Sequence, residues 1–283
     1  MHAFLAAEKT CISLRSMHPT GATMILRRIT EHVKAQNWFA VAIDFVIVVL
    51  GVFLGIQLGN WNAAQASARL GRDYVERLIR DLKEDEATVR NEAAYYGAVL
   101  DSVQRTDALL RAPDADPRAL VVNAYRASEI SYSAPVRATW DEIVSAGHLD
   151  LLPDGAAGKG LSQYYAFDIR QDIYRAGLES DYRRTVRRII PMSVQIAMRE
   201  GCSDVRDATG YITGFAGACT LEADSATLET VAAALRNDPA VAAELRYQYS
   251  FAVSSVLNIG GAKATLEQGL AALGAAPAAE SAP

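Results

Sequence analysis

A long apolar run lies between two tryptophans, Trp38 and Trp61. From Phe39 to Gly59 it has 21 residues, of which only Asp44 is charged. At a rise of ~1.5 Å per residue, a helix of this length spans roughly 30 Å, the thickness of the hydrocarbon core of a bilayer. Core helices of soluble proteins rarely run so far without a polar face, and tryptophans at both ends are typical of membrane interfaces. The pattern therefore predicts a transmembrane helix over residues 38–61, in contact with the lipid bilayer.

The charges that flank the run set the expected topology. Arg27, Arg28 and Lys34 precede it closely, whereas the basic residues that soon follow it are balanced by acidic ones. The positive-inside rule therefore predicts a cytoplasmic N-terminal tail, residues 1–37, and an exported C-terminal domain. In a bacterium, this topology places the helix in the inner membrane and the domain in the periplasm.

Two alternatives concern the beginning of the chain. Ala64-Gln65-Ala66 resembles the cleavage site of a signal peptide. The apolar core of a signal peptide is usually ~7–15 residues, which is shorter than this run, so we favour a retained anchor. Met24 opens directly into the basic flank, and the sequence leaves open whether translation starts at Met1 or Met24.

Beyond the apolar run, apolar residues follow helical spacing almost throughout the chain. Leu70, Tyr74, Leu78 and Leu82 fall at four-residue steps, and the pattern continues toward Arg111. No proline or helix-ending glycine separates this stretch from the membrane segment. We predict that one helix runs on from the membrane segment and ends near Arg111, before the prolines that follow.

Capping residues and periodicity predict the remaining helices. They are expected at about 117–127, from a Thr139–Glu142 capping box to Gly147, at about 156–198 with a break or kink at Pro191, from a cap at Ser225 to about 236, and from Asp238-Pro239 onward. We expect a loop at 202–219 and a disordered tail at 274–283. Almost no stretch alternates as a strand would. The predicted fold class is all-α: an N-terminal single transmembrane helix that runs into an elongated extracytoplasmic helical bundle, residues 62–273.

Three glycines, Gly51, Gly55 and Gly59, lie near one face of the predicted membrane helix. Small residues at four-residue steps let two membrane helices approach closely. Asp44 lies on the same face, because seven residues make nearly two helical turns. A carboxyl inside a membrane is costly unless it is paired or hydrated. Asp44 is therefore either hydrated or protonated near the cytoplasmic side, or in contact with a second copy of the chain or a partner membrane protein. A proton relay would need further membrane carboxylates.

The cysteines are divided between the two sides of the predicted membrane. Cys202 and Cys219 lie beyond the membrane segment, and Cys11 precedes it. Disulfides form in the oxidising periplasm, so we predict a Cys202–Cys219 bridge, with two free buried thiols as the alternative. In the chain-entropy model, a bridge that closes a loop of this size stabilises a domain by ~3 kcal/mol.

Four arginines form a basic stripe at helical spacing: Arg183, Arg184, Arg187 and Arg188. Such a stripe is a candidate site for an anionic ligand or for lipid headgroups. The alternative is ion pairing with the acidic stretch between Asp81 and Glu86, in surface pairs that contribute little each. We favour the second interpretation.

Composition and charge exclude several classes of function. The chain is 51% hydrophobic, enough for a sizeable core, and its 28 basic and 33 acidic residues give a net charge of −5. This balance disfavours a nucleic-acid partner, and three cysteines without a CxxC or Cys/His pairing offer no zinc site. His148 and Asp150 have no nucleophile in a recognisable elbow, and the glycines at 155–160 lack the spacing of a phosphate loop. We expect no catalytic residues, no metal and no cofactor.

Two groups of residues resemble a known family. They are Asp44-x6-Gly51, Gln57 and Asn60-Trp61-Asn62 followed by Tyr74-x3-Leu78-x2-Asp81-Leu82, and Thr139-Trp140-x2-Ile143-x2-Ala146-Gly147-x-Leu149 with Leu161-x2-Tyr164-Tyr165. Over about Asp44 to Tyr182, the chain resembles the DUF6090 family of bacterial membrane proteins. Members more often carry Glu at position 44, and they carry Glu where this chain has Ala63. The resemblance implies topology and location, and it adds no chemistry.

These observations lead to one functional hypothesis and one alternative. The hypothesis is a non-enzymatic, single-pass inner-membrane protein whose exported helical domain is a scaffold or interaction module. The alternative is an extracytoplasmic sensory bundle that binds a small ligand. Because the cytoplasmic tail is short, such a sensor would act through a partner.

Overall fold

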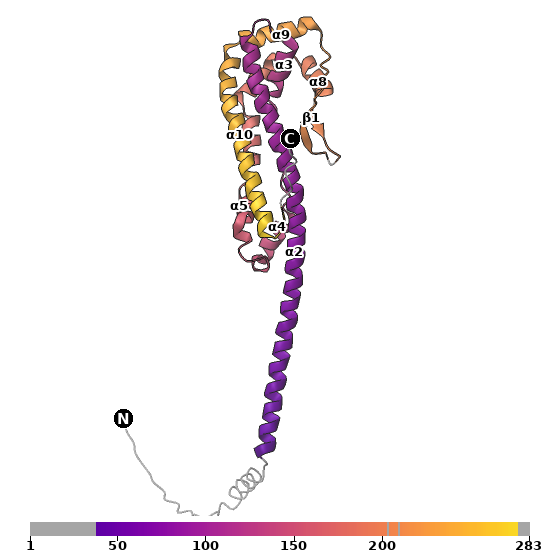
Figure 1. Ribbon diagram of the computed structural model, residues 1–283, viewed down its shortest axis with the longest axis vertical. Coiled ribbons are helices and arrows are strands. Elements are labelled where there is room, and N and C mark those ends of the chain that lie inside the picture. The colour runs from indigo at the N-terminus through magenta and orange to yellow at the C-terminus, as the bar shows by residue number, and fades with distance from the viewer. Residues whose placement is uncertain (1–37, 203, 209, 277–283) are drawn as a thin grey trace, which may run out of the picture. The chain divides into compact units, whose positions relative to one another are not determined.

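The computed structural model describes residues 38–202, 204–208 and 210–276, which are mostly helical (Figure 1). The predicted cytoplasmic tail, residues 1–37, lies outside this range, and of the predicted C-terminal tail only residues 274–276 fall inside it. The chain divides into two compact units, residues 1–65 and 66–283. Helix α2 (Trp38–Arg111) contributes residues to both units.

After α2, the second unit contains shorter helices, one hairpin and one long final helix (Figure 1). In chain order these are α3 (Pro117–Arg126), α4 (Ala138–Ala146), the 3-10 turn η1 (Leu149–Leu151), the π-helical turn η2 (Ala157–Leu161), α5 (Ser162–Ala166), α6 (Ile169–Leu178), α7 (Asp181–Ile189), α8 (Met192–Gly201), β1 (Asp204–Arg206), β2 (Ile212–Phe215), α9 (Ser225–Asn237) and α10 (Pro239–Ala272). The predominantly helical class predicted from the sequence is confirmed.

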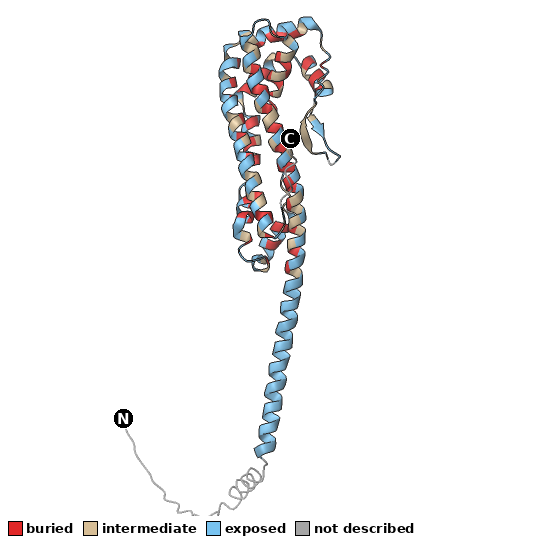
Figure 2. Ribbon diagram, in the orientation of Figure 1, coloured by how far each residue is buried: buried red, intermediate tan, exposed pale blue. Residues whose placement is uncertain are grey.

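The part of α2 in the first unit is apolar and exposed. Every residue from Trp38 to Gln65 is exposed, as the continuous pale blue of this segment shows (Figure 2). Among the described residues, α2 is the one helix long and apolar enough to cross a membrane, and none of its most apolar window is buried.

The second unit is built around two buried apolar clusters. One joins α3, α7, α9 and the first part of α10, with Leu120 and Val186 among its members. The other packs one face of α2 against α4, α5 and the later part of α10, and it includes Leu78, Leu82 and Leu266. The apolar residues at four-residue steps from which α2 was predicted therefore form its buried face.

Several helix ends lie where the sequence predicts them. Helix α2 ends at Arg111. Gly147 closes α4 in the left-handed conformation (φ 71°), which glycine adopts without a steric penalty. At the start of α10, the Asp238 carboxylate accepts a hydrogen bond from the backbone N–H of Ala240 at 2.9 Å, and Pro239 occupies the first turn.

The break predicted at Pro191 is confirmed, whereas the continuous helix predicted from 156 to that point is wrong. This region forms η2 and four short helices, α5 to α8. Ser180 starts α7 anew, because its hydroxyl accepts a hydrogen bond from the N–H of Arg183 at 3.2 Å, and α7 ends before Pro191. The breaks have a packing reason: each short helix turns its own apolar residues inward, so that Ile173 of α6 and Tyr182 of α7 are both buried.

The predicted capping box at Thr139 is also wrong. Helix α4 begins at Ala138, so Thr139 lies inside the first turn, where it is buried. Glu142 pairs with Arg77 of α2 instead of reaching back to the backbone. A tertiary ion pair has therefore replaced the local hydrogen bond that the motif predicts.

The cap of α9 lies one residue earlier than predicted. Asp224, rather than Ser225, accepts a hydrogen bond from the N–H of Thr227 at 2.7 Å. A carboxylate at this position also interacts favourably with the positive end of the helix dipole.

The segment expected to be a loop at 202–219 contains an antiparallel hairpin. In it, Asp204 of β1 lies opposite Phe215 of β2, and Val205 lies opposite Gly214. Its strands have three and four residues, which is too short for an alternating pattern to be visible in the sequence.

Candidate functional site

The predicted interface residues of the membrane segment lie on the surface of α2 in the first unit. Asp44, Gly51, Gly55 and Gly59 are all exposed. A Cβ built on any of the three glycines meets no atom within 4 Å. This face therefore has room for a second helix. The two flanking tryptophans are also exposed, Trp38 by 68% and Trp61 by 60%.

The predicted cysteine pair is confirmed. Cys202, directly after α8, and Cys219, after β2, are joined with an S–S distance of 1.97 Å. The bridge ties the base of the hairpin to the end of α8. Next to the bridge, the backbones of Gly201 and Thr220 are in contact, and the N–H of Thr220 donates to the carbonyl of Gly201. A Cβ at Gly201 would lie 1.9 Å from the carbonyl oxygen of Thr220. Only glycine fits at position 201.

The four arginines predicted as one stripe are divided: Arg183 and Arg187 are half-buried, and Arg184 and Arg188 are exposed. Arg183 donates to the carbonyl of Ser128, and Arg187 pairs with Glu129 and stacks over the ring of Tyr125 at 3.3 Å from its centroid.

The outer two arginines make local contacts on α7. Arg184 pairs with Asp181 at 2.8 Å, and Arg188 contacts the hydroxyl of Thr185. The predicted pairing of the stripe with the acidic stretch at 81–86 is therefore wrong. The partners come instead from α7 itself and from the segment that follows α3.

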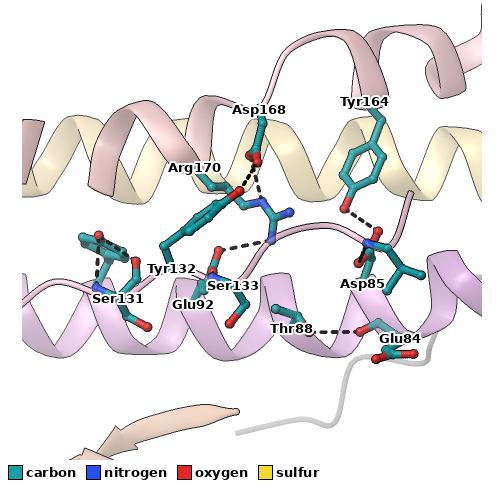
Figure 3. A network of polar contacts seen from close by, with 12 residues as sticks. Glu84, Asp85, Thr88, Glu92, Ser131, Tyr132, Ser133, Tyr164, Asp168 and Arg170 are labelled. Atoms are coloured by element: carbon teal, nitrogen blue, oxygen red, sulfur yellow. Dashed lines mark hydrogen bonds and ion pairs between the residues drawn. The ribbon is translucent and has the colours of Figure 1, made fainter. Parts of the chain in front are cut away.

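One acid of this stretch, Asp85, belongs to a different site, a buried polar network between α2, α5, α6 and the extended segment 129–137 (Figure 3). That segment pairs with no strand, so side chains must satisfy its backbone groups. Glu92 accepts from the N–H of Ser133 at 2.6 Å, and Asp85 accepts from the N–H of Val136 at 2.9 Å. The two acids lie two helical turns apart on one face of α2. The two carboxylates therefore hold the extended segment against this face of α2.

One buried arginine connects the acids of this network. Arg170 is 3% exposed, its Nη1 lies 3.3 Å from a Glu92 oxygen, and its Nε lies 3.5 Å from Asp168. Asp168 also accepts a hydrogen bond from the hydroxyl of Tyr132 at 2.7 Å, and Asp85 accepts one from the hydroxyl of Tyr164 at 3.0 Å (Figure 3). The carboxyl groups of Glu92 and Asp168 thus pair with one guanidinium, and Asp85 interacts with it electrostatically.

Burial changes the protonation of the two acids that α2 contributes to this network. Burial raises the pKa of Glu92 to about 7, although the Arg170 guanidinium acts in the opposite direction. Burial likewise raises the pKa of Asp85 to about 6, against the hydrogen bonds from Val136 and Tyr164. Both carboxyls change charge near neutral pH, whereas ordinary carboxyls are fully ionised there.

The sequence carried a signal for this network that its apolar pattern concealed. Leu78, Asp85, Glu92 and Val99 recur every seven residues along α2, and all four are buried. Asp85 and Glu92 therefore lie on the same face of α2 as core residues. Acids on a buried face must be hydrogen-bonded or paired, so this spacing indicates buried carboxyls with partners. Arg170, in contrast, lies in a short helix whose boundaries the sequence did not reveal.

A pocket of about 300 Å³ opens beside the network. It is lined by residues of α5, the start of α6 and α10, among them Gln163, Phe167, Asp168, Arg170, Asn258 and Thr265. Phe167 is an exposed aromatic ring, with 62% of its surface accessible. Within the described residues, no group of three or more His, Cys, Asp or Glu side chains is placed to hold a metal ion.

No protein-family model, curated protein or solved structure matches this chain.

Proposed function

We propose that this protein is anchored in the bacterial inner membrane by one transmembrane helix, residues 38–61. In this proposal the tail, residues 1–37, lies in the cytoplasm, and the helical domain, residues 62–273, lies in the periplasm. The observation that carries the proposal is the apolar part of α2, none of which is buried. Soluble proteins rarely leave a contiguous apolar surface of this length in water, whereas a bilayer covers it at no cost. The bridge between Cys202 and Cys219 suits an oxidising compartment.

The exported domain, in this proposal, is a non-enzymatic scaffold or interaction module, and membership of the DUF6090 family is part of the same hypothesis. Its pairing would proceed through the membrane helix. Support comes from the glycine face, where Gly51, Gly55 and Gly59 leave space for another backbone to approach, and from Asp44 on the same face. The partner would be a second copy of the chain or another membrane protein.

The topology is tested in native membranes. We expect the full-length protein to resist extraction with alkaline carbonate. An alkaline phosphatase fused to its C-terminus should be active, because this enzyme matures only in the periplasm, and a fluorescent protein that matures in the cytoplasm should stay dark in the same position. Release into the carbonate supernatant, or a fluorescent C-terminal fusion, would contradict the anchor or its orientation.

The pairing is tested by crosslinking in the same membranes. Gly55→Leu fills the glycine face and should reduce the yield of crosslinked species, and Asp44→Ala should weaken it without preventing insertion. Phe53→Leu, two residues from Gly55 and hence on another face, is the matched control and should leave the yield unchanged. Equal yields for all three variants and the wild type would exclude pairing through this face.

A second candidate function is a sensory domain that binds a small ligand and acts through a partner. One observation favours it, the pocket next to Asp168 and Arg170. Its lining combines charged, amide, hydroxyl and aromatic groups, as small-molecule sites commonly do.

A further inference from the structure

The pocket beside the polar network presents a negative charge to a bound molecule. Asp168 lines it and keeps 18% of its side-chain surface exposed, whereas Arg170 and Glu92 behind it are each 3% exposed. With Asp85, the group holds three carboxyls against one guanidinium, a formal surplus of two negative charges when all are ionised. A cation in the pocket would meet this surplus across a partly desolvated environment, where charges interact more strongly than in water.

The mouth of the pocket adds a surface suited to organic cations. Phe167 follows α5 directly and leaves most of its ring uncovered. The face of an aromatic ring attracts an ammonium group, by more when water is partly excluded. Gln163, Asn258 and Thr265 add amide and hydroxyl groups around the same space.

The wall of the pocket offers hydrogen-bond donors. The side-chain amides of Gln163 and Asn258 line it, and both residues are exposed. An amide N–H in such a place can donate to an oxygen on the bound molecule. Arg170 is engaged by Glu92 and Asp168 through Nη1 and Nε, and its Nη2 is buried.

We propose that this pocket binds a small organic cation that carries an oxygen acceptor, of the amino-alcohol class. The ammonium group contacts the Asp168 carboxylate and the ring of Phe167, and the hydroxyl oxygen accepts from the side-chain amide of Gln163 or Asn258. The larger pocket of about 530 Å³, between α2 and α10, lacks this charge surplus, because its lining has one acid, Asp107, and two arginines, Arg111 and Arg246. The proposed site goes beyond the scaffold function and does not depend on how the membrane helix pairs.

The test compares three probes of similar size on the full chain in detergent micelles, by calorimetric titration at pH 7.5. The probes are 3-aminopropan-1-ol, n-butylamine, which replaces the hydroxyl by a methyl group, and propane-1,3-diol, which replaces the amine. We expect saturable binding of the amino alcohol, binding weaker by about threefold to tenfold for the amine, and weaker by about tenfold or more for the diol. Equal heats for all three probes, or no saturable binding of the amino alcohol, would overturn the proposal.

Two variants separate the site from nonspecific attraction. Asp168→Asn removes the charge and keeps an acceptor for Tyr132, and we expect it to weaken binding of the amino alcohol by about tenfold or more. Asp172→Asn, in the same helix but 54% exposed and paired with Arg175, is the matched control and should bind normally. Equal affinities of these two variants would assign the binding to general surface charge.

A third variant keeps the proposal falsifiable if Asp168→Asn fails to fold. Phe167→Ala removes a ring that is mostly exposed, so the circular dichroism of the folded protein should not change. We expect its affinity for the amino alcohol to fall by about threefold to tenfold. Wild-type affinity in this variant would show that the ring takes no part in the site.

Discussion

Replacing Arg170 by methionine is the sharpest test of the buried network. The side chain is 3% exposed, and it neutralises Glu92, which is equally buried. Methionine fills a similar space without a charge. The substitution therefore leaves the Glu92 carboxyl inside the domain with the N–H of Ser133 as its remaining hydrogen-bond donor from this network.

The expected loss of stability is large and depends on pH. Removing one partner of a buried ion pair costs about 3–5 kcal/mol, because the other charge stays buried and uncompensated. A carboxyl whose pKa is raised by folding binds more protons in the folded state, so its contribution to the free energy of unfolding falls as pH rises. For Glu92 in the wild type this fall extends from about pH 4.5 to about pH 7.

Loss of the guanidinium raises the pKa of Glu92 further in the Arg170→Met variant. Each additional unit costs about 1.4 kcal/mol at a pH above both values. The difference in unfolding free energy between wild type and variant should therefore be larger at pH 8 than at pH 5, where Glu92 is protonated in both proteins.

The assay is urea unfolding of the full chain in detergent micelles, followed by circular dichroism at both pH values. Arg175→Met is the matched control, because Arg175 lies on the same helix, is 65% exposed and faces Asp172 at 3.9 Å. It should change the unfolding free energy by less than about 0.5 kcal/mol. Adding Glu92→Gln to Arg170→Met removes the stranded charge and keeps an acceptor for Ser133, so most of the stability should return. If Arg170→Met is as mild as the control, or equally destabilising at pH 5 and pH 8, the account of Glu92 as a buried, charge-coupled group is wrong.

Two further predictions concern backbone constraints. Replacing Cys202 and Cys219 together by alanine should lower the unfolding free energy by ~3 kcal/mol, and adding a reductant to the wild type should shift its urea midpoint toward that of the variant; a wild-type midpoint that ignores the reductant would argue against the bridge. Gly160→Ala should cost ~2 kcal/mol or more, because Gly160 has φ +100° and a Cβ there would lie 2.6 Å from the carbonyl oxygen of Thr265. Gly158→Ala, with no atom within 4 Å of the new Cβ, is its control, and thermal unfolding that shows equal effects at both sites would refute the steric argument.

The sequence by itself determined the features that depend on near neighbours in the chain. The apolar run after Trp38, the stripe of α2 that includes Leu78 and Leu82, and the cap at Asp238 are set by spacing within a few turns of helix. The Cys202–Cys219 pair belongs here too, because no other pair of cysteines follows the apolar run.

Only the tertiary structure decided the features that depend on distant partners. The sequence predicted surface ion pairs for the acids at 81–86, yet Asp85 is buried because the extended segment 129–137 needs an acceptor at Val136. Glu142 does not cap a helix as predicted, because it forms an ion pair with Arg77, 65 residues away in the chain. Helical periodicity continued across the break at Ser180, since the short helices on either side repeat the same spacing on new axes. Local pattern fixes which face of a helix is apolar, whereas the packing of separate segments decides which polar groups are buried with it and what each of them must bind.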